Sequence, residues 1–159
     1  MITRRNFIGG VLAAGTGAAL SRADETSRWQ IGCYTRPWAE HDYRVALDGI
    51  AEAGFTFAGL MTAKSGTLIT PATPTEPVVT MAAEAKSRGL RIASTWGGNF
   101  LTKPSVAEGV TGLRRLIDHC ALCACPGLLI GGTSKPELVA DYYKAVAECC
   151  DYAAAKGVG

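Results

Sequence analysis

The chain has 159 residues, of which 48% are hydrophobic and 19% are charged, and its net charge is +2 at pH 7. This composition excludes a disordered chain and is sufficient for one globular domain with a hydrophobic core. The charge is too small to favour nucleic acid or an anionic membrane surface as a partner, so we expect a small molecule instead.

The first 23 residues have the pattern of a twin-arginine signal peptide. Arg4 and Arg5 precede the bulky apolar Phe7, which is the form of a receptor-read export signal. The apolar run at 8–20 is too short to cross about 30 Å of hydrocarbon, so we expect no stable membrane anchor. Small residues at 21 and 23 fit a cleavage site. The pattern predicts export to the periplasm by the twin-arginine machinery; the alternative is a chance arginine pair before a buried helix.

Residues 24–159 alternate between short apolar runs and segments with helical periodicity. Strands are predicted at 29–34, 56–60, 90–95 and 127–131, with an amphipathic helix after each. A glycine follows each helix, where a left-handed residue would end it: Gly54, Gly89, Gly127 and Gly157. Ser105 and Ser134 each stand three residues before a glutamate, which predicts capping boxes at the starts of the last two helices.

Short apolar strands separated by helices are typical of a parallel sheet buried on both faces. Two α/β architectures remain: a complete doubly wound sheet of four strands, or part of a (β/α)8 TIM barrel, which needs about 250 residues. The string "GGTSKPE" has Gly, Ser and Lys in the wrong order for the phosphate loop of many doubly wound folds. Val158 and Gly159 stand where a fifth strand would begin. We therefore predict that residues 24–159 form the N-terminal half of a TIM barrel, with about four of eight βα units.

Six cysteines fall within these predicted elements: Cys33 in the first strand, Cys120, Cys123 and Cys125 at the end of the third helix, and Cys149 and Cys150 in the fourth helix. Three interpretations are open. The residues are buried structural thiols, or "CALCAC" with His119 forms a metal or iron–sulfur site, or a disulfide joins neighbouring helices. The string has no second cysteine pair at zinc-finger spacing, which favours buried thiols.

Several strings together carry a family resemblance. The leader, "WQIGCYTRPW", "IAEAGFTFAGLM", "AAEAKSRGLRIASTWGG" and "AAAKGVG" resemble the exported sugar phosphate isomerase/epimerase group within the xylose-isomerase-like TIM barrels. The resemblance implies a divalent metal, Mn²⁺, Mg²⁺ or Zn²⁺, held by Glu, Asp and His at the ends of later strands, beyond Gly159. The chain departs from the pattern at Gly59, where many members have an acidic residue at the end of the second strand.

Residues after the strands are the candidates for binding a substrate, because the carboxyl ends of barrel strands face the active site. They are Tyr34, Arg36 and Trp38 after the first strand, Lys64 after the second, and Trp96 and Asn99 after the third. Aromatic faces stack on sugar C–H surfaces, and Asn and Lys bind hydroxyl or phosphate groups. No catalytic residue and no metal ligand is predicted in the chain, because His41 and His119 fall on or beside helices, with no carboxylate at a strand end near them.

The resemblance implies a metal-dependent isomerase or epimerase of sugars or sugar phosphates, with a small carbohydrate as its substrate. In such an enzyme a divalent ion polarises a carbonyl while carboxylates move a proton on the neighbouring carbon. We expect the 159-residue chain to be inactive alone. Two alternatives are open: an exported sugar-binding or scaffold protein without catalysis, and a metal-dependent hydrolase or dehydratase on the same barrel. Association into a homo-oligomer is also left open.

Overall fold

A computed structural model of the chain describes residues 29–101 and 103–159, so the predicted signal peptide lies outside the described residues. The strands of the main sheet are β1 (Gly32–Tyr34), β2 (Phe57–Leu60), β5 (Arg91–Gly98) and β6 (Leu128–Ile130). The α-helices are α1 (Tyr43–Glu52), α2 (Thr75–Ser87), α3 (Val106–Leu122) and α4 (Pro136–Ala155). A 3-10 helix, η2 (Arg36–Trp38), follows β1, and a hairpin of β3 (Thr62–Ala63) and β4 (Gly66–Thr67) follows β2.

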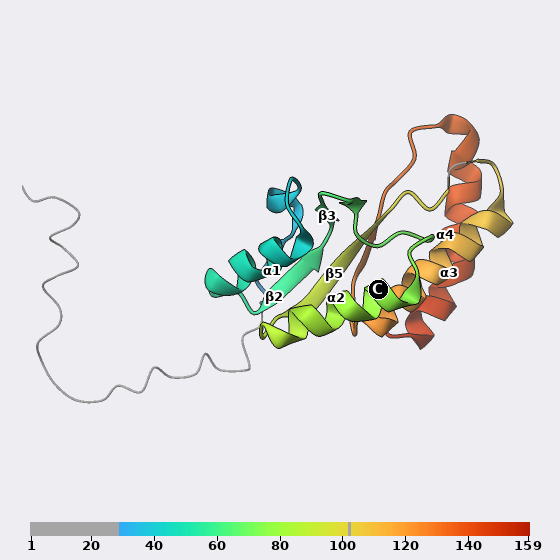
Figure 1. Cartoon of the computed structure of the whole chain (residues 1–159). Helices are drawn as coiled ribbons and strands as arrows, with labels where there is room; N and C mark the ends of the chain where they lie inside the picture. Colours follow the sequence, from blue (N-terminus) through green and yellow to red (C-terminus); the bar gives the residue numbers. More distant parts are fainter. Residues whose placement is uncertain (1–28, 102) are drawn as a thin grey trace, which may run out of the picture.

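The main sheet has the strand order β1-β2-β5-β6, and every neighbouring pair is parallel. The helices cover one face of this sheet, which leaves the opposite face, called the open face below, without a helix among the described elements (Figure 1). Because each crossover contains a helix, the carboxyl ends of all these strands meet at one edge. The predicted fold class is confirmed: four parallel βα units with the arrangement of half a TIM barrel.

The hydrophobic core lies between the sheet and the helices. Leu47 and Ile50 of α1, Leu60 of β2, and Leu116 of α3 have no more than a trace of exposed surface. Burying a side chain of this size stabilises the fold by about 1.5–3 kcal/mol. The three-to-four residue spacing that predicted the helices is therefore the spacing of their buried faces. In the part of the chain that the structure describes, no helix is long and apolar enough to cross a membrane.

Three of the four predicted glycine helix ends are confirmed. Gly54, Gly89 and Gly157 have φ values of +85°, +75° and +69°. The prediction for Gly127 is wrong, because the left-handed residue after α3 is Ala124, at φ +50°. Pro126 explains the difference: it cannot continue a helix and disfavours helical backbone in the residue before it, so α3 ends before the glycine is reached.

Of the two serine caps predicted at the starts of α3 and α4, one is present and the other is not. Half of the capping box predicted for α3 is present: the Ser105 hydroxyl accepts a hydrogen bond of 3.3 Å from the backbone N–H of Glu108, whereas the Glu108 carboxylate pairs with Lys103 at 2.8 Å. Ser134 does not cap α4, whose N-cap is Lys135 and has no side-chain bond. Pro136 sets this start, since its fixed φ favours the first helical position and places the cap one residue after the serine.

Candidate functional site

Three of the predicted substrate-binding residues lie at the carboxyl edge of the sheet. Tyr34 is the last residue of β1. Trp96 lies within β5 rather than after it, because this strand continues to Gly98, and Asn99 follows directly. Together with Ser94, these side chains form a group that we call the strand-end cluster: Tyr34, Ser94, Trp96 and Asn99.

A bulge in β5 decides which way the cluster faces. Ala58 pairs with Ile92 and Gly59 pairs with Ser94, so Ala93 is an extra residue with no partner on β2. Ile92 is part of the core on the helix side. With strict alternation, Ser94 and Trp96 would also point at the helices. The extra residue reverses the alternation and turns both side chains to the open face, which is a recognised use of β-bulges.

Tyr34 reaches Ser94 across the glycine of the middle strand. The two hydroxyls lie 2.5 Å apart in a hydrogen bond, although 60 residues separate them in the sequence. Gly59 stands between them, and a Cβ atom at this position would collide with the Tyr34 ring. The absence of a side chain at Gly59 thus makes room for the Tyr34 ring.

Trp96 and Asn99 meet above β6. Gly131, which follows β6, donates its N–H to the carbonyl of Gly98 at 2.9 Å. A side chain at Gly131 would collide with the Asn99 amide oxygen and contact the Trp96 ring, so these groups already occupy the space above its backbone. A hollow of about 160 Å³ adjoins Asn99, and the β6–α4 loop lines it with the polar residues Thr133, Ser134 and Lys135.

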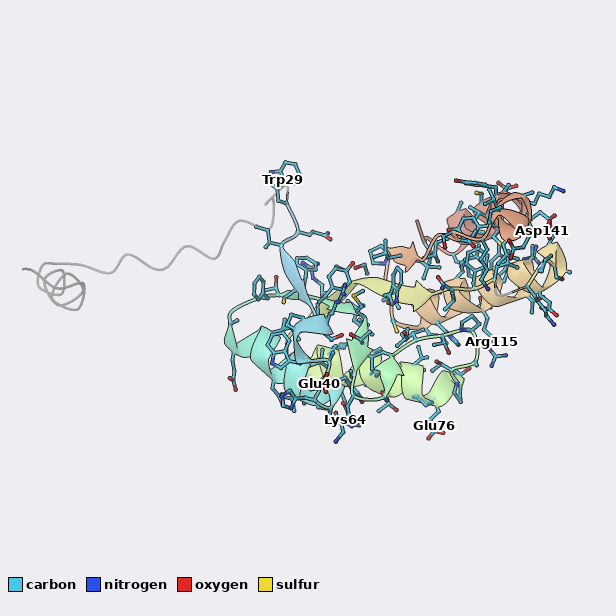
Figure 2. All side chains as sticks on the ribbon, turned by 90° about the horizontal axis from the view of Figure 1, so that it is seen from above. Trp29, Glu40, Lys64, Glu76, Arg115 and Asp141 are labelled. Carbon is cyan, nitrogen blue, oxygen red and sulfur yellow. The ribbon has the colours of Figure 1, made fainter. Side chains whose placement is uncertain are left out.

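The remaining predicted site residues lie elsewhere. Arg36 is exposed in η2, and the Trp38 ring packs over Gly49 of α1 as part of the rim of the core. Lys64 is exposed at the tip of the β3–β4 hairpin, where its N–H bonds the carbonyl of His41 at 2.9 Å, and Figure 2 shows it beside Glu40 at the periphery. Neither Trp38 nor Lys64 contacts the strand-end cluster through any interaction identified in the described chain.

Sequence reasoning missed Ser94 and the loop residues that line the hollow. The only sequence signal for Ser94 is a pair of polar residues, Ser94 and Thr95, inside an otherwise apolar strand. In a strand of regular alternation, the two residues of such a pair face opposite sides of the sheet. Thr95 does face the helix side, where it is fully buried and its hydroxyl donates to the Cys125 sulfur at 3.5 Å.

The residues described do not fit a bound divalent metal. Within residues 29–101 and 103–159, no three His, Cys, Asp or Glu side chains converge as a ligand set. Asp42 caps α1 by accepting from the N–H of Arg44 at 2.9 Å. His119 is buried, and its pKa is lowered by that burial and by the nearby Arg115 charge.

Comparison with known proteins identified no matching family model and no matching curated protein. Solved structures do match. A xylose isomerase domain protein from Planctomyces limnophilus aligns at 12% identity and a TM-score of 0.49, over 71% of this chain and 45% of that chain. A putative xylose isomerase from Rhodospirillum rubrum aligns at 22% identity and a TM-score of 0.53, over 82% of this chain and 52% of that chain. The chain spans about half the length of these structures, and the second likeness shows the fold alone: four βα units placed as in a xylose-isomerase-type barrel.

Proposed function

We propose that the strand-end cluster binds a small carbohydrate, as part of an exported, metal-dependent sugar isomerase or epimerase. The observation that carries this proposal is the position of Tyr34, Ser94, Trp96 and Asn99 on the open face, at the carboxyl edge of a parallel sheet. This edge is where ligands bind in TIM barrels and open parallel sheets. The Rhodospirillum rubrum structure that matches in fold is named a putative xylose isomerase, and such an enzyme acts on a sugar.

The chemistry of the cluster suits a sugar. Trp96 and Tyr34 provide aromatic faces for the apolar C–H surface of a pyranose or an open-chain sugar. Asn99 has both a donor and an acceptor, and the loop at Thr133, Ser134 and Lys135 adds hydroxyl and ammonium groups beside it. A compact set of aromatic and polar groups therefore lines one continuous edge, with few charges to select an ion instead.

Catalysis requires groups other than these. Proton transfer between neighbouring carbons requires a polarised carbonyl and a base, and the described strand ends provide neither a metal ligand set nor a carboxylate in the cluster. We propose that those groups belong to further strands of a larger protein, so that this chain recognises the sugar without converting it.

The test is a titration of the 159-residue chain with D-xylose and D-xylulose, followed by saturation-transfer NMR. We expect weak binding that Trp96→Ala reduces at least tenfold, which is about 1.4 kcal/mol. Asn99→Ala should weaken binding to a similar extent. The matched control is Tyr143→Ala, because Tyr143 is an aromatic residue that is 68% exposed on α4, on the helix side.

Each outcome has a definite consequence. Binding that persists in Trp96→Ala and Asn99→Ala would move the sugar site away from the cluster. A folded chain that binds neither sugar would overturn the proposal. If a protein with all eight strands binds the sugar but does not isomerise it in the presence of Mn²⁺, the result would favour a non-catalytic sugar-binding protein.

A further inference from the structure

The C-terminal turn of α3 brings two cysteines together. The N–H of Cys125 donates to the carbonyl of Cys120 at 2.9 Å, and the N–H of Ala124 donates to the carbonyl of Ala121 at 3.1 Å. These two bonds, with Ala124 at φ +50°, define a Schellman turn. In this turn the residue two after the cap commonly contacts the residue three before it, and those residues are Cys125 and Cys120.

The pair is enclosed and has specific partners. Cys120 is 0% exposed and Cys125 is 2% exposed. The Thr95 hydroxyl donates to the Cys125 sulfur at 3.5 Å, so the pair lies against β5. Cys123 turns the other way, with its sulfur 3.8 Å from the carbonyl of Val78 in α2. The three cysteines of the "CALCAC" string thus divide into one pair and one separate thiol.

The two thiols of the pair differ in acidity. Their mutual hydrogen bond raises the pKa of Cys120, as does burial, and it lowers the pKa of Cys125. The Thr95 hydroxyl also lowers the pKa of Cys125, by stabilising a negative sulfur. Burial raises the pKa of Cys123 to about 12. The Thr95 hydroxyl, which donates to the Cys125 sulfur at 3.5 Å, would stabilise a thiolate there, and the thiolate is the nucleophile of sulfur chemistry, so we assign Cys125 as the first sulfur to react and Cys120 as its partner.

We propose that Cys120 and Cys125 form a dithiol that hydrogen peroxide oxidises to an intrachain disulfide. The Cys125 sulfur attacks one peroxide oxygen, the O–O bond breaks, and one water leaves as a sulfenic acid forms. The Cys120 sulfur then attacks the Cys125 sulfur, the S–S bond forms, the S–O bond breaks, and the Cys120 proton leaves with the hydroxyl as a second water. The balance is two thiols and one peroxide to one disulfide and two waters.

Burial selects the class of oxidant. Cys120 and Cys125 are 0% and 2% exposed, so an oxidant reaches their sulfurs only when the end of α3 opens, and hydrogen peroxide needs a smaller opening than a bulky disulfide does. Cys150 is exposed on α4, so small and bulky oxidants both reach its sulfur and its exposure selects neither. The backbone bond from the N–H of Cys125 to the carbonyl of Cys120 holds the two residues close to each other before oxidation.

The test uses the reduced 159-residue chain, treated with hydrogen peroxide or with oxidised glutathione, then alkylated and digested with trypsin. The peptide from residue 116 to residue 144 contains Cys120, Cys123 and Cys125 and no other cysteine. With peroxide we expect this peptide to lose two hydrogens, and fragmentation to place the bond between residues 120 and 125. Oxidised glutathione at equal concentration should oxidise the pair at least tenfold more slowly.

Variants give an independent check. Cys120→Ser and Cys125→Ser should abolish the bridge, while Cys123→Ser and the exposed control Cys150→Ser should retain it. If a variant fails to fold, the wild-type chain decides the question, because fragmentation of its peptide locates the bond directly. The melting temperature of the wild-type chain should rise on oxidation. Any of three results would overturn the proposal: a wild-type peptide that is still fully alkylated after peroxide treatment, a bridge to Cys123, or faster oxidation by oxidised glutathione than by peroxide.

Discussion

Gly59 shows how one residue can arrange a surface without contributing a side chain to it. It lies in the middle of the sheet, between β1 and β5, and its missing Cβ is the space through which Tyr34 reaches Ser94. The bulge at Ala93 provides the other half of the arrangement, because it places Ser94 opposite the glycine. Two local departures from a regular strand therefore produce one hydrogen bond between distant parts of the chain.

Replacing Gly59 with alanine should separate this pair. The new methyl group would occupy the position of the Tyr34 ring, so the ring must move and the bond to Ser94 must break. We expect a loss of about 1–3 kcal/mol in the free energy of unfolding, the usual cost of overpacking. Urea denaturation measures it. Gly132→Ala is the control, because no atom lies within 4 Å of a Cβ at Gly132. Equal stability of the two variants would show that the ring position is not fixed.

At the scale of elements, the end of α3 is held in an unfavourable backbone conformation. Ala124 has φ +50°, a region that costs an L-residue about 1–2 kcal/mol and costs glycine little. Ala124→Gly should therefore raise the free energy of unfolding by about 1 kcal/mol, reduced somewhat by the greater freedom of glycine in the unfolded chain.

The matched control lies three residues earlier. Ala121 is exposed in the last turn of α3, with helical backbone, so Ala121→Gly should lower the free energy of unfolding by about 0.5–1 kcal/mol. Thermal denaturation of both variants measures the two effects. If both substitutions destabilise the chain, the left-handed conformation at residue 124 is not what ends α3.

The same elements show what can be predicted from the sequence. Helices and strands were predictable because apolar spacing and glycine ends are local signals, and Gly54, Gly89 and Gly157 act as expected. The end of α3 was not, because Pro126 outweighs Gly127 and forces an alanine into the left-handed position. The position of the strand-end cluster was predictable only in part, since Tyr34, Trp96 and Asn99 follow from strand ends, whereas Ser94 depends on a bulge. A bulge is a property of the pairing between β2 and β5, and neither strand encodes it alone.

At the scale of the whole molecule, the sheet has two edge strands and an apolar groove beside one of them. β1 and β6 are the outermost strands of the described sheet. Gly159 pairs with the base of β6, through bonds of 2.8 Å to Pro126 and Leu128, and Leu129 above it is 46% exposed on the open face. A groove of about 270 Å³ runs between β6, α3 and α4, lined by Leu113, Ile117, Leu128, Ile130, Val146 and Val158.

These surfaces predict that the 159-residue chain associates with itself as its concentration rises, since an exposed edge strand beside an apolar groove is a template for pairing and for apolar burial. Leu129→Lys should oppose the association, because pairing of this edge would then remove a charged side chain from water. We expect the variant to associate only at about a tenfold higher protein concentration, which corresponds to about 1.4 kcal/mol in the free energy of association. Val139→Lys is the control. Val139 is 39% exposed on α4 and lies outside the groove lining, so its replacement adds the same charge at a different place. Sedimentation velocity over a range of concentrations measures both variants beside the wild type. A wild-type chain that sediments as a monomer at every concentration would contradict the prediction, and equal effects of the two lysines would assign the change to net charge and not to the edge of β6.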